Sequence, residues 1–434
     1  GWDVSMSKGQ PGAFNTADDG MRHLINHIKG MGDSDPDALT RAMLRWYSDN
    51  RRDEIRTMLK AAEYDNDPAP IPRATAKELF GRSDGTLTLS ASSISAYIDC
   101  PFKYFVDRGL KPEEERTFAS DPRSVGDIYH ECLMAVARQI MGDEELREKM
   151  RGTGGSGPDT EELERLVNEA LDELSQNYRG GLFISAGGEE YRMSRIREIC
   201  AAAAEAMASQ LAAESVTDAV FEEGFGRQKR FEPIKLNIGD DEVYVEGKID
   251  RADMIDTDGT GRVRIIDYKT GSDKLDLWKM RNGYKMQLMI YMISAATGGP
   301  EPAGMFYFNI KDPIESANDK TADQIGSLSE REAEDEFKLK GVYINEEGVL
   351  GAMPEKVLAS SKNSISREEY EETRNDVLAR IEETASGILG GKIRINPLRN
   401  DGRLVCSYCE YRSVCRRDRG YWKNSARIMP KKKK

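Results

Sequence analysis

Two short apolar stretches on either side of a turn limit the fold of this chain more than any other feature. Val243–Ile255 and Val263–Ile266 flank a segment that contains Asp258-Gly259, a dipeptide that favours a tight hairpin turn. The two stretches are therefore expected to form neighbouring antiparallel strands. On the second strand Asp267 and Lys269 are two residues apart, so both side chains project from the same face of the sheet.

The charged side chains of this hairpin have the composition of a hydrolytic metal site. Asp250 lies on the first strand, where the hairpin can bring it opposite Asp267. Carboxylate oxygens are preferred ligands of Mg²⁺, and an ammonium group such as that of Lys269 can polarise or position a water for attack on a phosphodiester. Taken alone, Asp-x-Lys more often marks an exposed strand face with a weak ion pair than a metal site. The surrounding motifs therefore decide between these two interpretations.

Four sequence elements in a fixed order supply that context. They are Gly-x-x-x-His at 126–130, Gly-x-Ile-Asp-Arg at 247–251, Asp-Tyr-Lys-Thr-Gly at 267–271 and Gln-x-x-x-Tyr at 287–291. This order resembles the RecB-like branch of the PD-(D/E)xK nuclease superfamily. The resemblance implies an α/β fold with a restriction-endonuclease-like core, in which a mixed sheet is flanked by helices.

The resemblance also implies a role for each site residue. The ligands that it implies for Mg²⁺ (or Mn²⁺) are His130, Asp250, Asp267 and the carbonyl oxygen of Tyr268. Lys269 would be catalytic together with the two aspartates, and Gln287 and Tyr291 would support the active site and the DNA strand. Without the resemblance, His130 would be a core histidine, and Gln287 with Tyr291 a polar helix face beside an interfacial tyrosine.

The six cysteines indicate a second metal centre. Cys132 and Cys200 lie in helical, partly apolar settings and are interpreted as buried thiols. The other four are Cys100, Cys406, Cys409 and Cys415. Four cysteines in a chain without a secretory signal suit a thiolate-bound metal better than disulfides. Zinc and a 4Fe–4S cluster both accept four thiolates, so the spacing alone leaves both open.

The position of these cysteines is similar to the iron–sulfur staple found in the nuclease-bearing AddB component of AddAB-type helicase–nucleases. One cysteine precedes the nuclease core in Cys-Pro-Phe-Lys-Tyr-Phe (100–105), and three follow it in the 406–415 cluster. The resemblance therefore implies a 4Fe–4S cluster on these four residues. Such a cluster would close a long loop and hold the two ends of the nuclease domain together.

Length and composition limit the class of protein. The chain has 434 residues, enough for two or three domains, and it is 38% hydrophobic and 32% charged, as soluble proteins are. It has no apolar run long enough to cross a bilayer and no secretory signal, so no membrane partner is expected. The net charge of −13 is unfavourable for tight autonomous DNA binding, although a nuclease needs only a local basic channel.

Three regions are expected along the chain. Residues 1–85 are helical, at Met21–Met31, Asp37–Tyr47 and Arg51–Ala62, and resemble the end of an upstream helicase-like portion. Residues 86–422 form the nuclease domain, with a helical insertion at about 131–225 and the cysteine cluster at 406–415. Residues 423–434 are a basic tail, either phosphate-binding or disordered. The start at Gly-Trp-Asp suggests a fragment, and no phosphate-binding loop of a nucleotide-hydrolysing motor is present.

His23 and His27 lie four residues apart in the first helix, but surface or core histidines are far commoner at this spacing than metal ligands. Elsewhere the expected helices are Val125–Met141, Asp159–Asn177, Ser194–Glu214, Leu277–Ala296 and Ser366–Leu389. Further strands are expected at Phe231–Ile238, next to the hairpin, and at Gly304–Ile310. Loops are expected at Arg151–Pro158 and at the acidic stretch Ser316–Asp335.

The resemblance implies a metal-dependent DNA exonuclease domain of a helicase–nuclease. Such a complex processes double-strand DNA ends for recombinational repair in the bacterial cytoplasm, and this component cuts the 5′-ended strand. Its partners would be DNA ends, single strands and an AddA-like subunit. One alternative is a stand-alone CRISPR-type iron–sulfur nuclease, although such proteins are much shorter. The other is a nuclease-inactive iron–sulfur scaffold that binds DNA, against which the intact His130, Asp250, Asp267 and Lys269 argue.

Overall fold

The structure is a computed structural model in which two compact units are distinguished. It describes residues 16–32, 34–62, 66–112, 122–152, 157–177, 189–257, 259–271, 273–310, 337–346, 349, 358, 363–417, 425–430 and 432. The first unit comprises Gly1–Gly85, Ser93–Glu113 and Thr384–Lys434, and the second comprises Thr86–Ser92 and Glu114–Glu383. The expected acidic loop Ser316–Asp335 lies outside the described residues.

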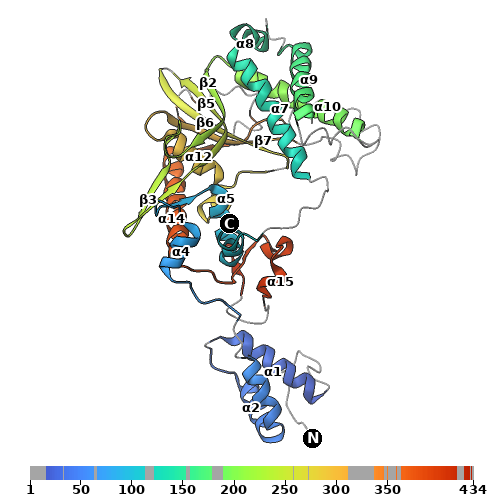
Figure 1. The fold of residues 1–434 in the computed structure, drawn as a ribbon, viewed down its shortest axis with the longest axis vertical. Helices are drawn as coiled ribbons and strands as arrows, with labels where there is room; N and C mark the ends of the chain where they lie inside the picture. Colours follow the sequence, from blue (N-terminus) through green and yellow to red (C-terminus); the bar gives the residue numbers. More distant parts are fainter. Residues whose placement is uncertain are drawn as a thin grey trace. The chain divides into compact units, whose positions relative to one another are not determined.

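A six-stranded mixed sheet forms the centre of the second unit. Its strand order is β2-β5-β6-β7-β8-β9. Figure 1 labels the first four of these strands. The strands are β2 (Val216–Phe225), β5 (Gly247–Thr257), β6 (Thr260–Lys269), β7 (Glu301–Asn309), β8 (Lys340–Ile344) and β9 (Ser364–Ile365). Neighbours are antiparallel except for β6 with β7 and β8 with β9, which are parallel. The predicted α/β fold with a mixed sheet flanked by helices is confirmed.

The hairpin that organises the sequence joins β5 to β6. Its pairs run from Arg251 opposite Ile266 to Thr257 opposite Thr260. Asp258 lies outside the described residues, and Gly259 has φ +80°, a conformation that glycine adopts without strain. The backbone N–H of Gly259 donates to Asp256 Oδ1 at 2.8 Å, which holds the turn. The predicted antiparallel hairpin is therefore confirmed.

The expected extent of the first hairpin strand is wrong. The chain leaves one sheet at β4 (Asp241–Val245) and enters another at β5, because Gly247 packs closely against Phe225. A Cβ at Gly247 would lie 2.8 Å from the Phe225 ring, so only glycine permits this crossing. Strand β4 instead forms a separate three-stranded sheet, of order β1-β4-β3, with β1 (Leu87–Leu89) and β3 (Ile234–Ile238).

The neighbour of β5 in the main sheet is β2, and not the 231–238 strand as the sequence predicts. Strand β2 covers residues 216–225, which the sequence assigns to the helical insertion. The helices before it are α7 (Pro122–Gly142), α8 (Glu144–Arg151), α9 (Thr160–Asn177) and α10 (Glu189–Leu211). Residues of α7, α9 and α10 share one hydrophobic core with β6 and β7, through side chains such as Leu133, Leu166, Met207, Ile266 and Phe306.

The helix expected at Leu277–Ala296 is two helices, α11 (Leu277–Arg281) and α12 (Gln287–Ala296). Gly283 with φ +89° and Lys285 with φ +54° interrupt the helical backbone between them. Since Ile266 and Tyr268 face the α7–α10 core, Asp267 and Lys269 face the opposite side of β6. Helix α12 lies on that side, because Lys269 contacts Gln287 at its first position.

The first unit begins with α1 (Ala17–Met31), α2 (Ala38–Asn50) and α3 (Arg52–Ala62). These helices form a core of their own around Met21, Leu24, Ile25, Met43, Tyr47 and Ile55. The side chains of Thr16 and Asp37 cap the first two helices, as N-cap residues commonly do. His23 and His27 stack on the exposed face of α1, with ring centroids 6.3 Å apart.

The remaining elements of the first unit include those that carry the cysteines. They are α4 (Arg73–Phe80), most of α5 (Ala91–Asp99), α6 (Pro101–Tyr104), the π-helical turn η1 (Phe105–Leu110), the end of α14 (Arg367–Leu389), β10 (Leu398–Asn400), β11 (Arg403–Leu404), the 3₁₀ turn η4 (Val405–Tyr408), α15 (Arg412–Cys415) and β12 (Arg427–Ile428). Strand β12 pairs in parallel with β10, so residues 427–428 of the basic tail belong to a sheet. Within the described residues, no helix is both long and apolar enough to span a membrane.

Candidate active site

The two aspartates of the hairpin lie on adjacent strands beside the predicted lysine. Because Arg251 pairs with Ile266, Asp250 stands next to Asp267 on the other face of the sheet. The Asp267 side chain is 0% exposed, and Lys269 Nζ lies 2.6 Å from its Oδ2 atom. The backbone N–H of Tyr268 donates to Asp250 Oδ2 at 3.1 Å. The structure thus brings Asp250, Asp267 and Lys269 to one end of β5 and β6.

Helix α7 brings His130 to the same end of β6. His130 Nε2 lies 3.2 Å from the carbonyl oxygen of Tyr268, and the two rings meet edge to face with centroids 5.2 Å apart. Gly126 lies one helical turn earlier, where a Cβ would be 3.3 Å from Thr270 Cγ2. Glycine at this position therefore lets the start of α7 pack closely against the residues that follow β6.

Helix α12 holds the lysine from the other side. Lys269 Nζ donates to Gln287 Oε1 at 3.4 Å, and Gln287 Nε2 donates to the Tyr291 hydroxyl oxygen at 2.7 Å. The Tyr291 ring meets Phe225 of β2 edge to face, at a centroid distance of 5.7 Å. A chain of polar contacts therefore runs from Asp267 through Lys269 and Gln287 to Tyr291, and it includes both predicted residues of α12.

Burial dominates the electrostatics of the two carboxylates. Burial and then the charge of Asp250 raise the pKa of Asp267 to about 7, although Lys269 and His130 act in the opposite direction. Burial also raises the pKa of Asp250. For His130 burial lowers the pKa, so the imidazole is neutral near pH 7, which is the form that binds metals. The ammonium group of Lys269 therefore does not offset the burial of the two carboxylates.

The donor set of this site fits a divalent cation. Asp267 Oδ1 is buried and has no hydrogen-bond donor among the described residues, and a cation would compensate for the missing donor. His130 Nε2 and the Tyr268 carbonyl oxygen, 3.2 Å apart, are spaced like neighbouring ligands of an octahedral ion, which stand about 3 Å apart. Across the described ranges, however, no group of three or more His, Cys, Asp or Glu side chains is arranged so that it could hold a metal ion.

Glu222 is a further acidic residue beside this site that sequence reasoning missed. On β2 it lies between Phe221, which pairs with Arg251, and Glu223, which pairs with Ile249, so it stands next to Asp250. Its charge helps to raise the pKa of Asp250 and opposes the lowering of the pKa of His130. It has φ +50° and forms an ion pair with Lys248. The β-branched and aromatic residues within Val216–Phe221, shortly after a helix, are the sequence signal that could have revealed this strand.

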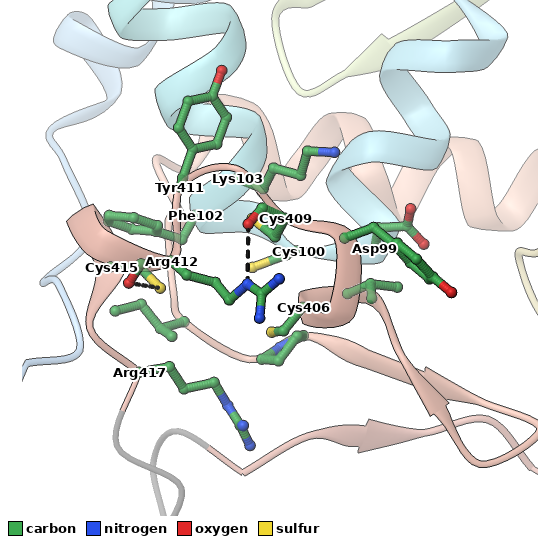
Figure 2. Close-up of a pocket in the computed structure, with 14 residues that line it drawn as sticks. Asp99, Cys100, Phe102, Lys103, Cys406, Cys409, Tyr411, Arg412, Cys415 and Arg417 are labelled. Carbon is green, nitrogen blue, oxygen red and sulfur yellow. Dashed lines mark hydrogen bonds between the residues drawn. The ribbon is translucent and has the colours of Figure 1, made fainter. Parts of the chain in front are cut away.

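The four predicted cysteine ligands line one pocket in the first unit (Figure 2). The pocket has a volume of about 250 Å³. Cys100 precedes α6, Cys406 lies in η4, Cys409 follows that turn and Cys415 ends α15. Cys100 is 9% exposed, and the other three are half-buried. The structure therefore places the distant Cys100 and the three clustered cysteines in the lining of one pocket.

The surroundings of the pocket favour the protonated thiols of Cys100 and Cys406 when no metal is bound. Burial raises the pKa of Cys100 to about 11 and also raises the pKa of Cys406. The Arg412 side chain extends toward the pocket and donates to the carbonyl oxygen of Cys409 at 3.2 Å (Figure 2). It also donates to the carbonyl oxygen of Ser407 at 2.7 Å. A thiophilic metal would therefore have to displace protons from these sulfurs. Cys132 and Cys200 are fully buried in the second unit, as predicted.

Comparisons with known proteins agree with this geometry. The family described as the PD-(D/E)XK nuclease superfamily matches residues 88–416. A Clostridium perfringens protein, named as the B subunit of an ATP-dependent helicase/deoxyribonuclease, is 28% identical over 409 residues, which are 88% of this chain and 34% of the relative. Proteins of the same name from Alkaliphilus metalliredigens and a Thermoanaerobacter species are 24% and 26% identical, over 87% and 89% of the chain. The chain spans about a third of the length of these relatives.

Proposed function

Because the chain belongs to the PD-(D/E)XK nuclease superfamily, we propose that it is a divalent-metal-dependent deoxyribonuclease with its active site at the end of β5 and β6. The observation that carries this proposal is the meeting of Asp250, Asp267 and Lys269 at one end of the hairpin, beside His130. Two buried carboxylates with raised pKa values and an ammonium group 2.6 Å away suit metal-assisted phosphodiester hydrolysis.

The residues that would hold Mg²⁺ or Mn²⁺ are His130, Asp250, Asp267 and the carbonyl oxygen of Tyr268. When bound, the ion would supply positive charge to the phosphate and lower the pKa of a bound water. Lys269 is fixed between Asp267 and Gln287, so its ammonium can donate a hydrogen bond to the attacking water or to the developing negative charge. Tyr291 orients Gln287, and through it the lysine.

The relatives support a more specific role for the chain. Each is named as the B subunit of an ATP-dependent helicase/deoxyribonuclease, and the similarity covers almost nine-tenths of the chain. We propose that the chain is the nuclease portion of such a complex, with an AddA-like partner, and that it processes double-strand DNA ends for recombinational repair. Cutting of the 5′-ended strand and a location in the bacterial cytoplasm stay predictions.

The domain assignment is part of the same proposal. Residues 1–85 would be the end of a helicase-like portion, and residues 86–422 the nuclease domain. Helices α1, α2 and α3 have a hydrophobic core of their own, which supports a separate helical segment at the start of the chain. The family match over residues 88–416 supports the start of the nuclease domain near residue 86.

A 4Fe–4S cluster on Cys100, Cys406, Cys409 and Cys415 is the second part of the proposal. Four sulfur donors around one pocket are the ligand set that such a cluster requires, and a tetrahedral zinc site uses the same set. When bound, the cluster would supply four metal–sulfur bonds between residue 100 and the 406–415 segment. Its role here would be structural, because none of the four cysteines belongs to the proposed active site.

Removal of divalent metal is expected to abolish DNA digestion by the full chain, since the buried carboxylates cannot hold the phosphate without a cation. Linear duplex and single-stranded DNA, labelled at the 5′ or the 3′ end, would be incubated with Mg²⁺, with EDTA, and with EDTA followed by excess Mg²⁺. Digestion should stop in EDTA and return with the metal, and the two labels report the polarity. Digestion that persists in EDTA contradicts the proposal, and DNA binding without digestion at any metal favours the scaffold alternative.

Metal binding is expected to weaken as the pH falls below about 7. The raised pKa of Asp267 means that a proton occupies the metal-free carboxylate below that pH and has to leave when the metal binds. Affinity should therefore drop up to about tenfold per pH unit below 7, and level off above it. Calorimetric titration with Mn²⁺ at pH 6 and pH 8, in buffers of different ionisation enthalpy, measures both the affinity and the released proton. Equal affinities without proton release at pH 6 would refute this expectation.

A further inference from the structure

A charged network is completely buried on the face of the main sheet opposite to the active-site carboxylates. Arg251 and Asp253 of β5 and Arg264 of β6 are each 0% exposed. Arg251 donates from Nε to Asp253 Oδ1 at 2.7 Å and from Nη2 to Asp253 Oδ2 at 2.8 Å. Arg264 Nε donates to Asp253 Oδ2 at 2.7 Å. The carboxylate thus binds both guanidinium groups at once.

Helix α10 completes this network through Gln210. The Gln210 side-chain oxygen accepts a hydrogen bond from Arg251 Nη1 at 2.9 Å, and its backbone oxygen accepts one from Arg264 Nη2 at 3.1 Å. These four residues, Arg251, Asp253, Arg264 and Gln210, are called the buried arginine network below. The network ties two strands of the sheet to the helix that covers them.

Stability alone gives no reason for this network. It contains two guanidinium groups and one carboxylate, hence a net charge of +1, and Arg264 Nη1 has no acceptor within the described residues. Taking three charges out of water is costly, and well-packed apolar residues in such positions are often equally or more stabilising. A role in fixing the geometry of its neighbours is a better explanation for charges at these positions.

Tyr268 connects the network to the active site. Its ring projects to the network side, where the strand register places it diagonally beside Arg251, and its hydroxyl lies 3.6 Å from Met207 Sδ. The ring also meets Phe308 edge to face at 5.5 Å. Its backbone contacts the proposed metal ligands, because its N–H donates to Asp250 Oδ2 and its carbonyl oxygen lies 3.2 Å from His130 Nε2.

We propose that the buried arginine network is a positioning device for the metal site. Arg251, held in place by Asp253 and Gln210, fixes the Tyr268 side chain, and the Tyr268 backbone in turn fixes Asp250 and His130. Arg251 and Asp253 are therefore positioning residues, which touch neither substrate nor metal. This inference rests on the proposed function for the identity of the metal site. A purely structural network would instead affect stability and leave metal affinity unchanged.

The chain offers a matched control for the experiment. Arg262, Glu346 and Arg367 form a second, partly exposed network, in which Arg367 donates to the Glu346 carboxylate at 2.6 and 2.8 Å and Arg262 pairs with the same carboxylate. Glu301 also pairs with both arginines of this network. Arg262 lies at the opposite end of β6 from Asp267 and Lys269. The test variant carries Arg251→Met, Asp253→Leu and Arg264→Met together, and the control variant carries Arg262→Met, Glu346→Leu and Arg367→Met.

Three measurements on the full chain decide the proposal. They are the Mn²⁺ affinity by calorimetry, the hydrogen exchange of the 264–271 peptide in metal-free protein, and the melting temperature. The test variant should bind Mn²⁺ at least about tenfold more weakly, because loss of a residue that positions a metal ligand typically lowers metal affinity by this factor. Its 264–271 peptide should also exchange faster. Its melting temperature should fall by at most a few degrees, since no unpaired charge is left and only Gln210 loses its donors. The control variant should match the wild type in affinity and in exchange.

The possible outcomes separate this inference from the proposed function. A folded test variant with wild-type Mn²⁺ affinity and wild-type exchange would overturn the positioning role. If the test variant does not fold, Tyr268→Phe decides, because it removes only the hydroxyl that faces Arg251. Faster exchange and weaker binding in that variant would support the proposal, and unchanged values would overturn it. If the wild type itself binds no divalent ion, the proposed metal site fails, and the exchange of the metal-free peptide still tests the positioning role.

Discussion

Replacing Asp267 with asparagine is expected to reduce metal-dependent DNA cleavage at least about 10³-fold while the fold is kept. Asparagine matches aspartate in size but removes the charge that would attract the cation. Folding tolerates this change, because burial and Asp250 raise the pKa of Asp267 to about 7. A carboxyl group with a raised pKa favours the folded state at low pH and loses that contribution as the pH rises through about 7. At pH 8 the neutral asparagine should therefore give an equal or higher melting temperature.

Lys269→Met separates binding from chemistry at the same site. The ammonium lies 2.6 Å from Asp267 Oδ2 but is not a metal ligand, so this variant should still bind Mn²⁺ and yet lose cleavage about 10²- to 10³-fold. The matched control is Lys235→Met, which removes an exposed lysine from β3 in the smaller sheet, where it pairs with Glu242. Single-turnover cleavage and calorimetric metal binding should be measured for all three variants. A wild-type cleavage rate in Asp267→Asn or in Lys269→Met would show that the site is wrongly assigned.

The part of this site that the sequence predicts is the part fixed by local rules. The two-residue period of a strand places Asp267 and Lys269 on one face, and the turn with Gly259 places Asp250 on the neighbouring strand. The association of His130 with the hairpin could not be derived from periodicity. It followed from the order of motifs, and the structure shows its physical basis in the close approach of Gly126 to Thr270.

The features that sequence reasoning missed depend on pairings between distant segments. Strand β2 becomes the neighbour of β5 because Phe225 fits against the bare backbone of Gly247, a contact that no local pattern reveals. Glu222 was missed together with that strand. The break between α11 and α12 depends on the left-handed backbone conformation of Lys285. Lysine rarely adopts this conformation, so the sequence gives no sign of it.

The buried arginine network was hidden for a different reason. In Arg251-Ala-Asp253 a charged residue alternates with a small one, a pattern that normally places the charges in water. Both charged side chains are instead fully buried, because α10 covers that face of the sheet and Arg264 pairs with the same carboxylate. Hydropathy describes the transfer of a single side chain from water to an apolar environment. It therefore cannot predict that oppositely charged side chains are buried together as ion pairs.

Cys100→Ser is expected to release the metal from the first unit and to loosen the segment that carries the other three cysteines. Neither η4 nor α15, which contain Cys406 and Cys415, has a buried residue, so apolar packing contributes little to holding them in place. Cys100 is the one proposed ligand outside the 406–415 cluster. The proposed cluster would close the loop from residue 100 to residue 406. Such a cross-link lowers the conformational entropy of the unfolded chain, and for a loop of this length it raises the free energy of unfolding by about 5 kcal/mol.

The measurements follow from where the loosening should begin. Wild-type protein purified without oxygen should hold about four irons per chain and absorb broadly in the visible range, and Cys100→Ser should hold none. Limited proteolysis of the variant should cut first between residues 405 and 417, and its melting temperature should fall. Cys200→Ala, which changes a buried thiol of the second unit, should keep its iron and serves as the control.

Two other results would change the interpretation in different ways. A colourless wild type with one zinc per chain would contradict the iron–sulfur cluster, while a loosened Cys100→Ser variant would still support a metal staple. A redox or catalytic cluster predicts the opposite combination, in which the variant loses nuclease activity but keeps its melting temperature and its digestion pattern. Because the proposed active-site residues all lie in the second unit and the four cysteines in the first, we expect the loss of activity to follow the loss of structure.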